Sequence, residues 1–540
     1  MRFPPLFRWF LLVLVAALML PVLAVFSSWG ALFSPDGVSL GLLQEMSRTV
    51  LPDYLFTTLI LCVLVTVGVV VVGLASALAV TVFDFPGRRW LEWALLLPLA
   101  MPAYVIAYAY TDFLQFSGPL QVGLRAALGV EGRVFPEVRN VGGAAWVFTF
   151  ALYPYVYLLA RTALGERAGH LLEAARLMGA PLGRRLREVA LPLARPAVAA
   201  GVALALMETL ADFGVSSYFG IQTFTAGIYK AWLAMDNRMA AAQLATLLLI
   251  WVAVLLKLEH RAQARMRFSA SKGGRQGTQD GAAYRLHGAR IGLVWAVCLV
   301  PVLMGFVLPV LFMLRPLLLD TNEIPWARFG DWALNSVRLG ALTSLLAVGV
   351  ALALAFNLRR SAHWSGRVAV QLASLGYAIP GAVVVVGLLL PVGWIQEWQP
   401  QWQVGYFVTA TAFGIVWAYL VRFSAVALQS IQSGYSRVPV SLDESARMLG
   451  AGNAALLARV HWPLLRRSVA AAALLVFVDV MKELPVTLVL RPFNSDTLAV
   501  VAYQLARDER LGEAALPCLA LVLVGLIPVI LLSRTLRARA

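Results

Sequence analysis

The chain has 540 residues, of which 60% are hydrophobic and 13% are charged, and it carries a formal net charge of +16. This composition lies outside the range of soluble globular proteins and indicates an integral membrane protein. A nucleic-acid-binding module would gather its basic residues in a patch on a soluble domain, whereas here they are spread along the edges of apolar segments. We therefore expect no nucleic-acid partner.

Apolar runs long enough to cross a hydrocarbon core of about 30 Å as helices recur along the whole chain. They read as continuous Leu, Val, Ala and Ile without the alternation of barrel strands, and a helix satisfies its own backbone in lipid. The prediction is an all-α polytopic membrane protein with about 12 transmembrane helices. In chain order the runs lie near 9–29, 55–80, 91–111, 143–163, 197–217, 238–257, 291–314, 334–356, 367–390, 405–424, 468–490 and 514–532.

A polar segment near the middle divides these runs into two groups of six. Its core, SASKGGRQGTQDG, is rich in Gly, Ser and Gln and has no apolar periodicity, which is typical of a flexible linker. We therefore predict a first six-span half at 1–257, a cytoplasmic linker at 258–290 and a second six-span half at 291–540.

Each half carries a polar loop after its fourth span, at 165–196 and at 428–467. A shift of 271 residues aligns Glu173–Gly201 with Glu444–Ala472, and 13 of the 29 aligned residues are identical. Such a duplication predicts two pseudo-symmetric six-helix bundles with a pathway between them.

The duplicated segment resembles the signature loop of ABC importer permeases: a Glu, two small residues, a Gly six positions after the Glu, and a later Pro. In that family the loop forms a helix, a turn at the Gly and a second helix, and it docks in a groove of an ATPase subunit. Small residues permit close approach, and Gly permits the turn. The second copy departs from the pattern at Ser445 and at Trp462. The matching positions are Glu173, Ala174, Ala175, Gly179 and Pro192 in the first copy, and Glu444, Ser445, Ala446, Gly450 and Pro463 in the second.

The chain has no G-x-x-x-x-G-K-[ST] phosphate-binding loop and no convergent set of nucleophile and base. We expect a transport subunit and not an enzyme, with no cofactor bound by this chain. The resemblance implies two copies of an ABC ATPase, which bind ATP and Mg²⁺ and take one loop each. A secondary transporter is the less favoured alternative, because it would have no use for duplicated docking loops.

The distribution of basic residues predicts the orientation in the membrane. We count residues near the ends of spans, such as Arg422, with the adjoining loop. With a cytoplasmic N-terminus, the cytoplasmic segments then hold 31 Lys and Arg residues and the opposite loops hold 11, which leaves Arg338 and Lys482 within spans. Basic residues in short loops remain on the cytoplasmic side. Together with the resemblance, this predicts a multi-pass protein of the bacterial inner membrane, surrounded by lipid, with both termini in the cytoplasm.

Two acidic pairs lie inside spans, where ionised side chains are costly and usually functional. Glu208 and Asp212 are four residues apart, as are Asp479 and Glu483, so each pair is expected on one helix face with its members about 6 Å apart. The 271-residue shift superposes the pairs. Hard cations prefer such oxygen ligands, so we predict that the four acids line the translocation pathway. The other interpretation is a gate held by hydrogen bonds.

A second resemblance concerns the segments that follow each loop. ETLADFGVSSYFG with TFTAGIYKAW, and KELPVTLVLRPFN with TLAVVAYQLA, resemble the fused two-half permeases of bacterial ferric iron importers, over nearly the whole chain. This implies a periplasmic binding protein that delivers Fe(III), and transient contact of Fe(III) with the four acids. Thiamine or another small periplasmic solute, moved by the same ABC mechanism, is the alternative.

Overall fold

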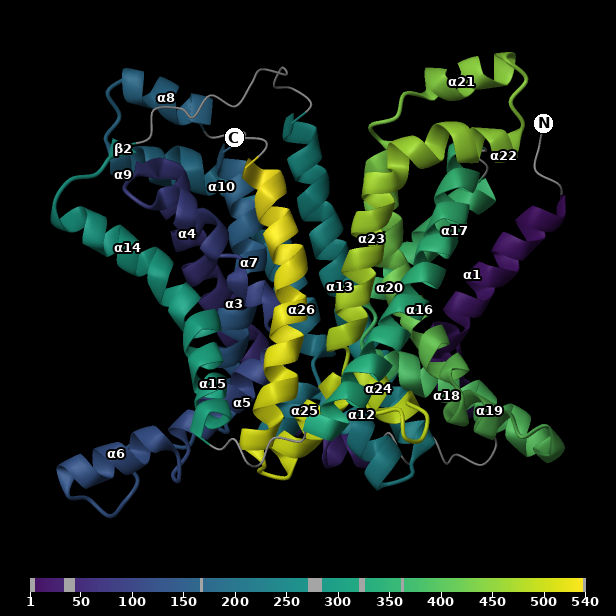
Figure 1. The fold of residues 1–540 in the computed structure, drawn as a ribbon, viewed down its shortest axis with the longest axis horizontal. Helices are drawn as coiled ribbons and strands as arrows, with labels where there is room; N and C mark the ends of the chain where they lie inside the picture. Colours follow the sequence, from purple (N-terminus) through teal and green to yellow (C-terminus); the bar gives the residue numbers. More distant parts are fainter. Residues whose placement is uncertain are drawn as a thin grey trace. The chain divides into compact units, whose positions relative to one another are not determined.

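The computed structural model describes residues 5–33, 44–165, 169–270, 284–319, 326–360 and 364–537. Helices dominate this part of the chain, and the predicted all-α class is confirmed (Figure 1). Two short strands among these residues, β1 (Phe83–Asp84) and β2 (Tyr284–Arg285), pair in parallel. They join the chain just after the second predicted span to the last part of the predicted linker.

The helices alternate between long apolar segments and short polar ones. In chain order the α-helices are α1 (Pro5–Phe26), α3 (Leu51–Val82), α4 (Arg88–Ala94), α5 (Ala103–Leu114), α6 (Pro119–Leu128), α7 (Val141–Ala163), α8 (Gly169–Leu177), α9 (Leu182–Arg185), α10 (Leu191–Ala211), α11 (Gly214–Phe219), α12 (Phe224–Tyr229), α13 (Arg238–Ala270), α14 (Ala289–Val302), α15 (Leu308–Leu319), α16 (Trp326–Arg360), α17 (Trp364–Leu375), α18 (Gly381–Trp398), α19 (Val404–Ala410), α20 (Ala412–Tyr435), α21 (Val440–Met448), α22 (Asn453–Ala455), α23 (Trp462–Lys482), α24 (Pro485–Leu490), α25 (Leu498–Arg507) and α26 (Leu511–Arg537). Short 3₁₀ or π segments connect several of them, among them η2 (Leu97–Ala100), η4 (Leu186–Ala190) and η10 (Leu456–His461).

In the described part of the chain, ten helices are long and apolar enough to cross a membrane, and a bent pair makes up to eleven. The bent pair, Arg88–Ala100 with Ala103–Leu128, turns by 90° where a single span near 91–111 is predicted. The break has a local cause: Met101 precedes Pro102 and is extended, with φ −102° and ψ 123°, because a residue before proline avoids the helical region. The chain is a polytopic membrane protein, as predicted.

The structure forms two compact units, and each combines segments from both predicted halves. One unit comprises Met1–Met46, Gly227–Leu249 and Pro325–Val501; the other comprises Ser47–Ala226, Ile250–Ile324 and Ala502–Ala540. The division at the linker remains a prediction about the duplicated sequence. Helix α13 continues to Ala270, so the predicted linker begins as helix, and residues 271–283 lie outside the described ranges.

The first helix of each predicted half packs on helices of the other half. In the first unit α1 packs on α17, α18 and α20, and the indole Nε1 of Trp417 donates a hydrogen bond to the carbonyl of Ala17 at 3.0 Å. A Cβ at Gly387 would overlap the carbonyl oxygen of Pro21, so a glycine lets α18 approach α1 closely. In the second unit α14 packs on α3, and α15 packs on α5.

Candidate coupling loops and membrane acids

The first polar loop is a helix, a turn and a second helix. Helix α8 ends in a turn at Gly179, whose φ is +80°, and the chain then continues through α9 and η4 into α10 (Figure 1). The Ala180 amide donates to the carbonyl of Ala175 at 3.0 Å, and the Gly179 amide donates to that of Arg176 at 3.0 Å. This paired pattern with a left-handed glycine is the Schellman ending of a helix.

The second loop repeats this geometry. Helix α21 ends at a turn in which Gly450 has a φ of +84°, and the chain continues through α22 and η10 into α23. The Ala451 amide donates to Ala446 at 3.0 Å and the Gly450 amide donates to Arg447 at 2.9 Å. The expected helix, glycine turn and helix are therefore present in both copies, and the role of these residues in docking stays a prediction.

Each turn displays two large apolar side chains that sequence reasoning missed. Leu177 and Met178 are 85% and 84% exposed, and Met448 and Leu449 are both 89% exposed. Glu173 and Glu444 are also exposed. Exposed apolar pairs at the tip of a polar loop indicate a contact surface for another protein. The signal was available in the sequence, because both pairs immediately precede the turn glycine.

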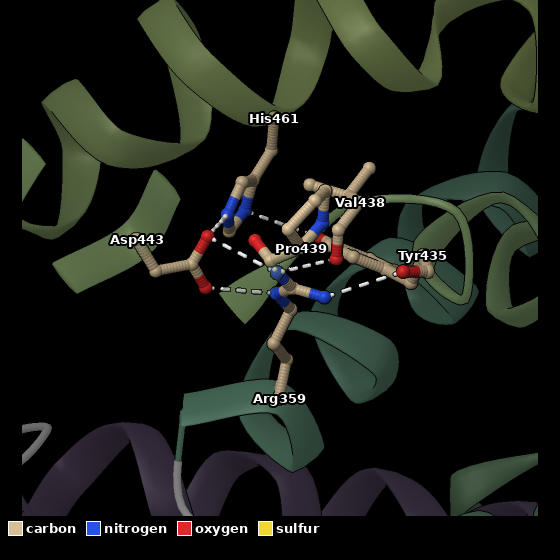
Figure 2. A network of polar contacts seen from close by, with 6 residues as sticks. All are labelled: Arg359, Tyr435, Val438, Pro439, Asp443 and His461. Carbon is tan, nitrogen blue, oxygen red and sulfur yellow. Dashed lines mark hydrogen bonds and ion pairs between the residues drawn. The ribbon is translucent and has the colours of Figure 1, made fainter. Parts of the chain in front are cut away.

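A buried polar network anchors the second loop (Figure 2). The guanidinium of Arg359, at the end of α16, donates from Nε to Oδ2 of Asp443 in α21 at 2.8 Å. The His461 Nε2 lies 3.0 Å from Oδ1 of the same carboxylate, and its Nδ1 lies 3.1 Å from the Tyr435 hydroxyl. Burial by itself would raise the pKa of Asp443, but hydrogen bonds from Arg359 and His461 and their charges outweigh it and lower that pKa.

The acids after each loop do not lie as predicted. The expectation that Asp212 and Glu483 continue one helix face with Glu208 and Asp479 is wrong, because α10 ends at Ala211 and α23 ends at Lys482. Asp212 and Glu483 have extended backbones, with ψ of 132° and 120°. Each predicted span at 197–217 and 468–490 therefore breaks at its second acid.

Both of these acids cap the short helix that follows. The Asp212 carboxylate accepts hydrogen bonds from the amides of Val215 at 2.9 Å and Ser216 at 3.3 Å. The Glu483 carboxylate accepts from the amides of Val486 and Thr487 at 3.0 and 3.1 Å. Since the first amides of a helix have no partner within the helix, an acid at this position replaces the lost bonds.

Glu483 also has a basic partner from a distant helix. The Arg422 Nη1 lies 2.6 Å from Oε1 of Glu483, and the two side chains are only 13% and 2% exposed. Arg422 lies in the middle of α20, so counting it among the cytoplasmic basic residues is wrong. The sequence places Lys482 within the same span as Glu483, but it gives no sign that Arg422, from another helix, is the partner of this acid. The counterpart of Arg422 under the 271-residue shift is Ala151, which cannot pair with a carboxylate.

Glu208 and Asp479 lie inside α10 and α23, and both are half-buried. Among the residues that the structure describes, no three His, Cys, Asp or Glu side chains gather closely enough to hold a metal ion. In the described part of the chain, Asp212 and Glu483 are therefore helix caps, and the four acids do not gather into a three-ligand metal site.

Known proteins resemble the chain over most of its length. Residues 69–258 match the family model described as binding-protein-dependent transport system inner membrane component. The Fe(3+)-transport system permease protein FbpB 2 of Haemophilus influenzae is 24% identical over 497 residues, covering 91% of each chain. The probable ABC transporter permease protein y4fN of Sinorhizobium fredii is 26% identical, covering 99% of this chain and 97% of its own. The putative 2-aminoethylphosphonate transport system permease protein PhnU of Salmonella choleraesuis is 25% identical over 39% of this chain and 75% of its own.

The helical architecture and these likenesses define a class: the chain is a permease subunit of an ABC transporter, a membrane transport component and not an enzyme. Within that class, residues 69–258 resemble the inner membrane components of binding-protein-dependent transport systems. Components of this kind work with an ATPase and a periplasmic binding protein and lie in the inner membrane.

Proposed function

We propose that the chain imports ferric iron delivered by a periplasmic binding protein. The observation that carries this proposal is the likeness over 91% of both chains to a permease named for Fe(3+) transport. The relative named for 2-aminoethylphosphonate matches only 39% of the chain, so its name is weaker support for a substrate.

The membrane acids support a cationic substrate to different degrees. The Glu483 carboxylate accepts hydrogen bonds from the Arg422 guanidinium, two backbone amides and the Thr487 hydroxyl. Four donors are as many as the two oxygens of a carboxylate usually accept. We therefore assign Glu483 a gating role. Transient contact with Fe(III) stays our proposal for Asp212, Glu208 and Asp479 because of their carboxylate chemistry and their place in the duplicated segments. Hard trivalent iron favours carboxylate oxygens for the same reason that other hard cations do.

The two loops supply the coupling to ATP in this proposal. Two copies of the ATPase, holding ATP and Mg²⁺, each receive one loop in a groove, and the pairs Leu177 with Met178 and Met448 with Leu449 enter that groove. Their exposure supports this arrangement, because burying them against a partner removes apolar surface from water. The positive-inside excess supports cytoplasmic loops and termini.

The test is uptake by energised cells that express the complete transporter. Radiolabelled Fe(III), thiamine and 2-aminoethylphosphonate are offered separately, and cells with Gly179→Pro, which disrupts the first loop turn, serve as the uncoupled control. We expect saturable uptake of Fe(III) only, abolished in the control at equal surface expression. Saturable uptake of either other solute, with none of Fe(III), would reject iron and retain the ABC mechanism.

A further inference from the structure

The two coupling loops have the same backbone but differ in how they are held. In the second loop, Arg359 uses all three nitrogens of its guanidinium. Besides its bonds to Asp443, it donates to the carbonyls of Val438 and Pro439 at 3.0 Å each and of Tyr435 at 3.3 Å (Figure 2). One side chain thus holds both the turn that enters α21 and α21 itself.

The His461 ring connects this centre to the second helix of the loop. It is fully buried in η10, just before α23, and packs edge-on against Phe356 of α16 and Tyr435 of α20, with ring centroids 5.4 and 5.2 Å apart. Because an ionised Asp443 can only accept, the ring donates from Nε2, while its Nδ1 lies 3.1 Å from the Tyr435 hydroxyl. Helices α16, α20, α21 and α23 therefore meet in one network.

The burial and charge of the network favour a stiff connection. Arg359 and Asp443 are 11% and 3% exposed, and their opposite charges compensate each other. A buried pair whose hydrogen bonds are satisfied is costly to open, because either partner alone would be left charged and poorly solvated.

The first loop cannot form this network. At the positions 271 residues before Tyr435, Asp443 and His461, the chain has Leu164, Leu172 and Ala190. The counterpart of Arg359 is Arg88, whose Nε lies 3.2 Å from Oε1 of Glu92 in its own helix. An ion pair in the described part of the first loop, between Arg184 and Glu188, joins residues within one helical stretch, and both side chains are more than 60% exposed. This pair therefore does not tie the loop to a membrane helix.

We propose that Arg359, Asp443, His461 and Tyr435 form a clasp that makes the second coupling loop a rigid extension of its membrane helices. The first loop then moves more freely relative to its membrane helices than the second loop does. The two ATPase subunits therefore act on the two halves through one flexible and one rigid loop. The clasp residues are positioning residues that act through α21. This inference rests on the docking of the loops to an ATPase and is independent of iron as the substrate.

Spin-label distances in the purified permease–ATPase complex test the clasp. With the three native cysteines replaced by Ala, one label pair joins α21 to α16, at Ser441→Cys and Leu345→Cys. A second pair joins α8 to α3, at Leu171→Cys and Val67→Cys. All four positions are exposed. We expect ATP to leave the first distance unchanged and to shift the second. An equal shift in both pairs would overturn the proposal.

Substitutions then separate positioning from folding. Asp443→Asn keeps the shape of the side chain and should broaden the α21–α16 distance distribution and speed amide exchange in α21 by about tenfold, while the KM for ATP stays unchanged. The control Glu188→Gln should leave both unaltered. Unchanged exchange in Asp443→Asn would reject the clasp. If the parent permease binds no ATPase, the proposed coupling itself is rejected. The clasp can still be tested in that case, because amide exchange in the isolated permease should be slower in α21 than in α8.

Discussion

Replacing Arg422 by Met tests the buried ion pair that the structure places at the break between α23 and α24. The substitution removes the charge and keeps much of the side-chain volume, so the Glu483 carboxylate remains 2% exposed without the 2.6 Å partner. Breaking a buried pair on one side costs about 3 to 5 kcal/mol. The remaining donors, two backbone amides and the Thr487 hydroxyl, place the expected loss of unfolding free energy near the lower limit of about 3 kcal/mol.

Reversible unfolding in mixtures of detergent and SDS, followed by far-UV circular dichroism, measures this loss. Adding Glu483→Gln to Arg422→Met removes the unpaired charge while the amide oxygen still caps α24, so the double variant should recover to within about 1 kcal/mol of the parent. A single variant as stable as the parent, or a double variant no better than the single, would refute the reasoning.

Three further predictions concern the loops, the pathway and the topology. Leu177→Asp should lower the affinity for the ATPase at least about tenfold without unfolding the permease, because it places a charge at the exposed tip of the loop and not in the core. Co-purification at equal expression measures the affinity, and full association would contradict the docking surface. Asp212→Asn keeps the acceptor oxygen that caps α11 and removes the charge, so Fe(III) uptake should fall below about a tenth with surface expression unchanged; near-normal uptake would assign this acid to gating alone. Reporter fusions at Gly277 and at Gln399 should read cytoplasmic and periplasmic, and the reverse at either site would reject the predicted orientation.

Local patterns predicted much of the fold. Continuous apolar runs identified the membrane helices because a helix satisfies its backbone within one segment. The loops were predictable for the same reason: Gly179 and Gly450 end their helices through bonds to residues only a few positions away. The helix breaks at Asp212 and Glu483 were missed, because hydropathy averages over a window and hides a single extended residue.

The sequence by itself determined the class of the protein, its helical spans and the duplicated loop, since each depends on composition or on contacts within one turn of helix. Only the tertiary structure decided which acids are compensated and which loop is anchored. Arg422 is 61 residues from Glu483, and Arg359 is 84 residues from Asp443. Neither pairing has a periodic signal, because the partners come from different helices and meet only when α20 packs on α23 and α16. In the sequence, Arg422 and Arg359 are two basic residues among many. In the folded units they pair with Glu483 and Asp443 and compensate the charges of these buried acids.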